Sequence, residues 1–143
     1  MKKLLLLFFA LTLVSCTSDD NPNEEFHFEL MPIANINMPE SFQYNNSYTI
    51  EYSYYRPTTC HVFNDLYFSY EANFRTIAVI NTVYEDTETL HCQPIEGQGE
   101  LEQRSFQFLC NNDGGTYIFK FWQGTDEDGV DQYLIREVPI VAN

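Results

Sequence analysis

The sequence predicts an all-β protein that folds as a single antiparallel β-sandwich, and three observations support this. Apolar residues recur at every second position along about seven segments, which is the period of a strand with one buried face. Turn-forming residues separate these segments, and no segment repeats apolar residues at the helical spacing of three and four. Phe, Tyr and Trp make up 16% of the chain, and such large rings fill the space between two sheets well.

The expected strands follow one another at short intervals. Phe26, Phe28 and Leu30 alternate with charged neighbours in the first strand, and apolar residues alternate with polar ones from Ser47 to Tyr55 in the second. The others run from His61 to Tyr70, Phe74 to Tyr84, Glu100 to Leu109, Thr116 to Trp122 and Gln132 to Val141. The turn formers between them are Asn45-Asn46, Arg56-Pro57, Glu71-Ala72-Asn73, Pro94 to Gly99, Asn111 to Gly115 and Gly124 to Gly129. About seven strands without a helical crossover favour a sandwich of immunoglobulin-like kind in residues 26–143.

One short segment supports this kind of sandwich. Asp113-Gly114-Gly115-Thr116-Tyr117-Ile118-Phe119 resembles the Asp-x-Gly-x-Tyr pattern that opens strand F of immunoglobulin-like domains. The resemblance implies a tyrosine corner at Tyr117. Phe119 stands where antibody domains have their second core cysteine, so we expect the standard disulfide between the sheets to be absent. A glycine turn that enters any β-strand would give the same pattern.

The first 15 residues have the three regions of a secretory signal peptide: Lys2 and Lys3, an apolar run from Leu4 to Val14, and Ser15 before the cleavage point. The apolar run reaches only about 16 Å as a helix, whereas roughly 20 residues are needed to span a bilayer. Leu13-Val14-Ser15-Cys16 resembles the lipobox of bacterial lipoproteins. The resemblance implies that Cys16 becomes the N-terminal residue and carries diacylglycerol and palmitate. The alternative is an ordinary secreted protein with a cysteine near its cleavage site.

The residues after Cys16 bear on the location of the protein. Thr17-Ser18-Asp19-Asp20-Asn21 resembles the acidic export tag of Bacteroidetes-type lipoproteins, which implies the outer face of the outer membrane. A solvated linker can have the same composition. No residue from Thr17 to Glu25 would join a core, so residues 16–25 are predicted to form a flexible, lipidated tether. Several acyl chains together make such an anchor stable.

The charge of the chain limits its partners. Twenty-one acidic residues stand against seven basic ones, a formal net charge of −14, which becomes about −16 without Lys2 and Lys3. Such a surface repels phosphate, so nucleic acid is excluded as a partner and the acyl chains are the expected membrane contact. The same charge keeps copies of the protein apart, and we expect a monomer.

Acylation of Cys16 would leave Cys60, Cys92 and Cys110 in an oxidising compartment, which predicts one disulfide and one spare thiol. If Glu71-Ala72-Asn73 is the tip of a hairpin, residue 60 lies opposite about residue 84, and the loop that follows can bring Cys92 back to it. We therefore expect Cys60 to pair with Cys92, for about 2 to 4 kcal/mol. Pairing of Cys92 with Cys110 is the alternative. A zinc site of Cys60-His61 and His91-Cys92 is disfavoured because adjacent strand residues point to opposite faces.

The acidic turn from Asp126 to Asp131 is the best candidate for a bound ion. Asp126, Asp128 and Asp131 around Gly129 resemble half of a calcium loop, in which carboxylate oxygens surround a hard cation. The next acid is Glu137, too far along the chain for the EF-hand pattern, and strands rather than helices flank the turn. The polar tip of a hairpin has the same composition, so both interpretations stay open.

Catalytic motifs are missing from the sequence. It has no Gly-x-Ser-x-Gly, no His-Glu-x-x-His and no phosphate-binding glycine loop. A carboxylate pair such as Glu51 and Asp65 would suit a glycan-active enzyme, but nothing in the spacing singles it out. We therefore expect no enzyme.

Two non-enzymatic functions remain. The first is a binding or adhesion module with a protein or glycan ligand, and the second is a structural or accessory subunit of an envelope complex. Tyrosines on one sheet could form the contact surface of the first: Tyr52, Tyr54, Tyr55, Tyr67 and Tyr70. The same tyrosines could instead be core rings. A contiguous exposed aromatic patch would favour the binding module.

Overall fold

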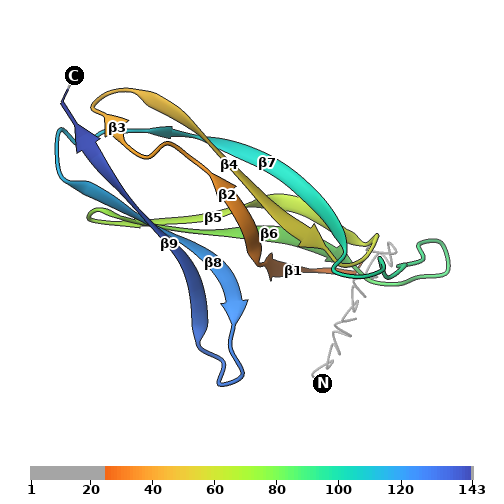
Figure 1. The fold of residues 1–143 in the computed structure, drawn as a ribbon. Helices are drawn as coiled ribbons and strands as arrows, with labels where there is room; N and C mark the ends of the chain where they lie inside the picture. The colour runs from red at the N-terminus through yellow and green to blue at the C-terminus, as the bar shows by residue number, and fades with distance from the viewer. Residues whose placement is uncertain (1–24, 143) are drawn as a thin grey trace, which may run out of the picture.

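The computed structural model describes residues 25–142 (Figure 1). In this part of the chain the secondary structure consists of nine strands, without a helix. The strands are β1 (Phe26–Met31), β2 (Ile33–Asn37), β3 (Phe42–Gln43), β4 (Ser47–Arg56), β5 (His61–Glu71), β6 (Phe74–Tyr84), β7 (Glu100–Leu109), β8 (Thr116–Thr125) and β9 (Asp131–Val141). The predicted all-β class is confirmed.

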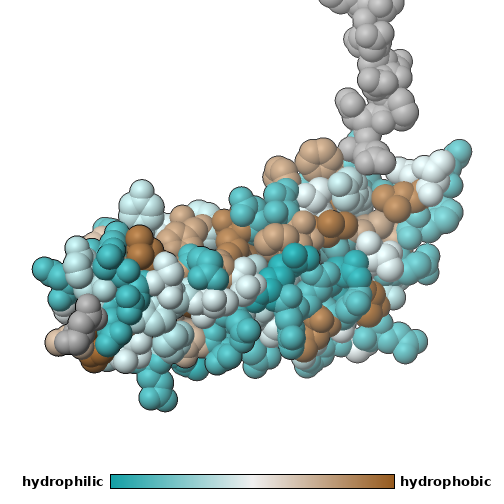
Figure 2. All heavy atoms as spheres, turned by 90° about the horizontal axis from the view of Figure 1, so that it is seen from above, coloured by the Kyte–Doolittle hydropathy of each residue, from teal (hydrophilic) through white to brown (hydrophobic). Residues whose placement is uncertain are grey.

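The strands form two sheets. Strand β4 lies between β2 and β7 in a three-stranded sheet. In the six-stranded sheet, β5 pairs along the whole of one side of β6, while β1 and β8 share the other side; β9 and β3 follow beyond β8. The sheets together make an elongated body whose surface is mostly hydrophilic in the view of Figure 2.

All seven predicted strands are present, with ends that differ by three residues at most. Strands β2 and β3 were not predicted. Strand β2 begins directly after Pro32, one residue beyond the end of β1, and a register shift between Ile33 and Asn35 interrupts its alternation. Strand β3 has only two residues, too few to show a period-two pattern.

The prediction that every pairing is antiparallel is wrong at two places. Strand β3 runs parallel to β9, and the first part of β6 runs parallel to β8. In both cases the two paired strands are not consecutive in the chain, and at least one strand of the other sheet lies between them in sequence. No hairpin connects the two partners, so hairpin geometry does not require them to be antiparallel.

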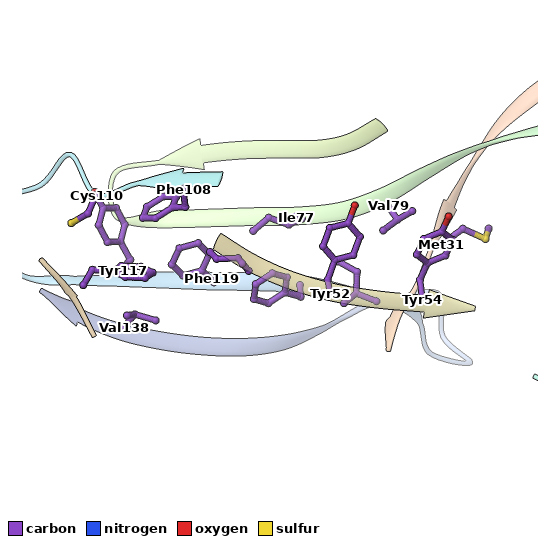
Figure 3. Packing of buried hydrophobic residues seen from close by; sticks show 14 residues of the cluster. Met31, Tyr52, Tyr54, Ile77, Val79, Phe108, Cys110, Tyr117, Phe119 and Val138 are labelled. Atoms are coloured by element: carbon purple, nitrogen blue, oxygen red, sulfur yellow. The ribbon is translucent and has the colours of Figure 1, made fainter. Parts of the chain in front are cut away.

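The core lies between the two sheets and is densest where four aromatic rings meet. Phe42 of β3, Phe108 of β7, and Tyr117 and Phe119 of β8 have ring centroids 5.0–6.2 Å apart, most of them edge to face. Figure 3 shows this cluster at one end of the core. Such pairs add about 0.5 to 1.5 kcal/mol each beyond the area that they bury.

Gly99 allows β7 to begin beside the end of β4. Its φ of 97° is rarely adopted by other residues, and a Cβ atom at this position would come within 2.4 Å of the carbonyl oxygen of Arg56. The glycine therefore positions the edge strand of the three-stranded sheet.

Candidate binding surfaces

The predicted lipidation site lies outside the described residues. The signal peptide, Cys16 and the tether up to residue 24 are not part of the structure described here, and their assignment stays a prediction. Glu25 is the first described residue, and its carbonyl oxygen accepts a hydrogen bond from the backbone of Glu85 at 2.8 Å. The domain thus begins beside the end of β6.

The predicted disulfide between Cys60 and Cys92 is confirmed. The hairpin of β5 and β6 turns at the predicted tip, and Tyr84 donates its backbone hydrogen bond to Cys60, so residues 60 and 84 are opposite each other. The Cα atoms of the two cysteines are 5.2 Å apart. Cys110 is a free thiol, fully buried in the core, and burial raises its pKa. The zinc interpretation is wrong, because two of its four ligands are oxidised.

The acidic turn between β8 and β9 is held by hydrogen bonds from its own residues. One carboxylate oxygen of Asp126 accepts from the backbone of Asp128 at 3.0 Å and of Val130 at 2.9 Å. The other accepts from the amide of Gln132 at 2.8 Å, and Asp131 accepts from the indole of Trp122. Within residues 25–142 no three acidic, His or Cys side chains are grouped closely enough to hold a metal ion.

Calcium binding at this turn therefore stays a prediction. A calcium ion that binds the native state must raise the melting temperature of chelated protein, which is the direct test.

The structure separates the five candidate tyrosines. Tyr52 and Tyr54 are core residues, with 3% and 0% of their surface exposed, whereas Tyr67 is 49% and Tyr70 76% exposed. Tyr55 is half-buried. Tyr67 alone of the five belongs to the patch defined below.

Tyr117 has the geometry that the sequence suggested. Its ring is fully buried; its hydroxyl accepts a hydrogen bond from the backbone of Asn112 at 3.1 Å and donates one to the side chain of Asn111 at 2.7 Å. This is the return to the preceding backbone that defines a tyrosine corner. Phe119 is fully buried between the sheets.

A charged cluster lies between the sheets at the end opposite the aromatic core. Arg56 pairs with Glu100 and Glu102, and Arg104 donates to Glu102 at 2.9 Å while its guanidinium lies 4.0 Å above the ring of Phe63. The hydroxyl of Tyr54 donates to the same carboxylate at 3.1 Å. Burial raises the pKa of Tyr54, and it raises that of Tyr52 to about 12. The ion pairs join β4 to β7, and the guanidinium of Arg104 contacts β5 through Phe63, but the buried Nε of Arg56 makes no hydrogen bond.

The two carboxylates considered for catalysis do not meet. Glu51 is on β4, and its side chain accepts a hydrogen bond from Asn37 at 2.7 Å on the outer side of the three-stranded sheet. Asp65 is on β5 in the other sheet and accepts from the backbone of Leu66.

The six-stranded sheet exposes large apolar side chains on its outer side. Register places these side chains together: Phe28 and Val62 both lie opposite Thr82, and Leu30 lies opposite Ile80. Each member is 41–62% exposed, and we call this set the apolar patch: Phe26, Phe28, Leu30, Val62 and Tyr67. Exposed contiguous patches of this kind mark interaction sites.

The sequence predicted β1 but not the direction of its side chains. Phe26, Phe28 and Leu30 have the spacing of a buried face, yet they point to solvent. The opposite side of the strand is used for polar contacts, since Glu29 lies 3.2 Å from the ring nitrogen of His61, which is only 7% exposed. The pairing of a buried histidine with Glu29 was not visible in the spacing.

The outer side of the three-stranded sheet is different, because its side chains are mainly amides and hydroxyls. Asn35 donates to Ser53 at 3.4 Å, and Gln107 donates to Thr49 at 2.7 Å. Leu101 and Leu109, near its two ends, are its exposed large apolar residues. The molecule therefore presents two chemically distinct outer faces.

Comparison with other proteins adds no relative. The chain matches no protein-family model, no curated protein and no solved structure at a significant level. Among the described residues, no helix has the length and apolar character needed to cross a membrane.

Proposed function

We propose that this protein is a lipid-anchored binding protein of the bacterial outer membrane, exposed at the cell surface, whose apolar patch docks on a partner protein. The observation that carries the binding role is the patch itself: five large apolar side chains, close together by strand register, lie in water rather than in the core. A non-enzymatic role accords with the absence of catalytic motifs from the sequence.

The lipid anchor in this proposal rests on the lipobox-like Leu13-Val14-Ser15-Cys16 and the acidic residues after it. The domain starts at Phe26, which is also the first residue of the apolar patch. A tether of about ten residues spans at most roughly 35 Å, so the patch would work close to the membrane.

The charge of the chain indicates the chemistry of the partner. A second copy without the signal peptide would bring its own net charge of about −16, and Asp65 and Glu71 are on the same strand as Tyr67. A partner with an apolar surface bordered by Lys and Arg complements the patch better than a second copy does.

An immunoglobulin-like kind of sandwich is part of the proposal. The buried tyrosine corner at Tyr117 supports it. The parallel pairing of β6 with β8 departs from the antiparallel sheets of antibody domains, so the likeness would be one of architecture rather than of exact topology.

The anchor is tested by metabolic labelling with an alkyne fatty acid in the producing bacterium. Label on the wild-type chain and none on a Cys16→Ala variant supports the anchor, and accessibility to protease on intact cells supports surface exposure. Absence of label on the wild type would contradict the anchor.

The docking surface is tested by site-specific photo-crosslinking. A photoreactive phenylalanine at position 28, in the apolar patch, should crosslink one partner protein in cells, whereas the same group at position 107 on the polar face should not. A crosslink between two copies of this chain would indicate that the patch mediates self-association rather than binding to another protein. Crosslinks to lipid alone would indicate that the patch faces the membrane. A stoichiometric, permanent complex would favour an accessory subunit over a free-standing binder.

A further inference from the structure

A trough runs across the strands on the outer side of the three-stranded sheet. Two rows of side chains border it, each with one residue from β2, β4 and β7: Asn35, Ser53 and Gln103 in one row, and Asn37, Glu51 and Ser105 in the other. The hollow has a volume of about 360 Å³. Between the rows, Tyr52 and Arg104 turn their side chains into the sandwich, so the floor is backbone.

The side chains of the trough are held in place while part of their bonding capacity remains free. Asn37 donates to Glu51 at 2.7 Å, and Asn35 donates to Ser53 at 3.4 Å. Each amide still has a second N–H and a carbonyl oxygen to offer. The amide of Gln103 makes no hydrogen bond within the described chain, and Ser53 is only 6% exposed at the bottom of the hollow.

The chemistry of the two rows selects for a neutral, hydroxyl-rich ligand. Amides and hydroxyls both donate and accept hydrogen bonds, as the hydroxyl groups of a sugar do, so the two rows can pair with such a ligand in both directions. The one basic residue of the lining is Arg104, and its guanidinium is turned to the other side of the sheet, over the ring of Phe63 and against Glu102. Glu51 and the overall charge of −14 repel phosphate, sulfate and carboxylate groups.

The dimensions suit a chain of sugar rings. The rows are two residues apart on each strand, a separation of roughly 7 Å, and three strands at about 4.8 Å spacing make the trough about 10 Å long. Both ends are open, since β2 and β7 are the edges of their sheet. We propose that this trough binds a neutral oligosaccharide along its length, independently of the apolar patch on the other sheet.

The test uses the chain without residues 1–15, with its disulfide formed. Binding is first measured on an array of neutral, sulfated and sialylated oligosaccharides, and each glycan that binds is then measured by calorimetry. We expect at least one neutral oligosaccharide to bind. Asn37→Ala and Gln103→Ala should each weaken that binding roughly tenfold, which is the usual effect of losing about one good hydrogen bond. Gln107→Ala, one row outside the trough, is the matched control and should bind as the wild type does.

Three outcomes would overturn the proposal: no neutral oligosaccharide binds at millimolar concentration, anionic glycans bind better than neutral ones, or the control variant loses as much affinity as the trough variants. The crosslinking at position 28 is a separate readout, so failure of the trough and failure of the docking patch can be told apart.

Discussion

The two sheets have similar inner sides but opposite outer ones. Inside, both contribute aromatic rings and aliphatic side chains to one core, such as Phe108 from the smaller sheet and Phe119 from the larger. Outside, the smaller sheet presents amides and hydroxyls around Ser53, and the larger presents Phe26 and Phe28 to water. Large apolar residues therefore occur outside the core as well as inside it, and the exposed apolar residues are the candidates for a binding function.

The largest effect should come from comparing the two sides of the six-stranded sheet. Phe119→Ala, on its inner side, should lower the free energy of unfolding by about 3 to 5 kcal/mol, because it leaves a cavity among packed rings. Phe28→Ser, on its outer side, should change it by less than about 1 kcal/mol. Urea denaturation of both variants measures the difference. A loss at Phe28 as large as that at Phe119 would mean that the patch is covered in the folded protein.

The disulfide should stabilise the larger sheet more than the smaller. Replacing Cys60 and Cys92 together by Ser should cost about 2 to 4 kcal/mol, because the unfolded chain regains the freedom of a long loop. Hydrogen exchange should speed up at Tyr84 and Thr59, whose backbone hydrogen bonds lie beside the bridge, before it does so in β4. Equal acceleration in both sheets would show that they unfold as one unit.

The tyrosines on the two sheets should respond differently to alkaline pH. Tyr52, beneath the smaller sheet, has a pKa raised by burial to about 12, so the folded state retains its proton longer than the unfolded state does. Its contribution, on the order of 2 kcal/mol, is complete below pH 10 and is lost as the pH rises from about 10 to about 12.

Stability curves of Tyr52→Phe should lack this part of the alkaline loss. The control is Tyr70→Phe, which removes a hydroxyl from an exposed ring and leaves Tyr52 in place, so the alkaline loss assigned to Tyr52 should remain. Identical profiles for wild type and Tyr52→Phe would show that the ring is not desolvated.

The smallest effect is expected on the polar face outside the trough. Gln107→Ala removes one exposed hydrogen bond to Thr49 and should change the free energy of unfolding by no more than about 0.5 kcal/mol. Thermal denaturation can detect a larger change, which would show that the polar face contributes to the fold.

The sequence was sufficient for seven of the nine strands and for the disulfide, because these depend on local patterns. Period-two alternation located the long strands, and the hairpin tip at Ala72 fixed the register that brings Cys60 to the end of β6. The outer apolar patch could not be predicted, since alternation at Phe26 and Phe28 is the same whichever side faces the core. The trough arises from the register of β2 with β4, and β2 was itself not predicted, because a register shift interrupts its alternation.

The pairing of Phe42 with Ile140 has a consequence for how the chain folds. The β5–β6 and β8–β9 hairpins can form from neighbouring residues, but β3 finds its partner only in the last strand. Topologies dominated by such distant contacts fold in milliseconds to seconds, and the slow step is the closure of the long loops. Phe42, a member of the central aromatic cluster, can therefore reach its final position only after residue 140 is available, so the core of the domain is complete only once β9 is in place.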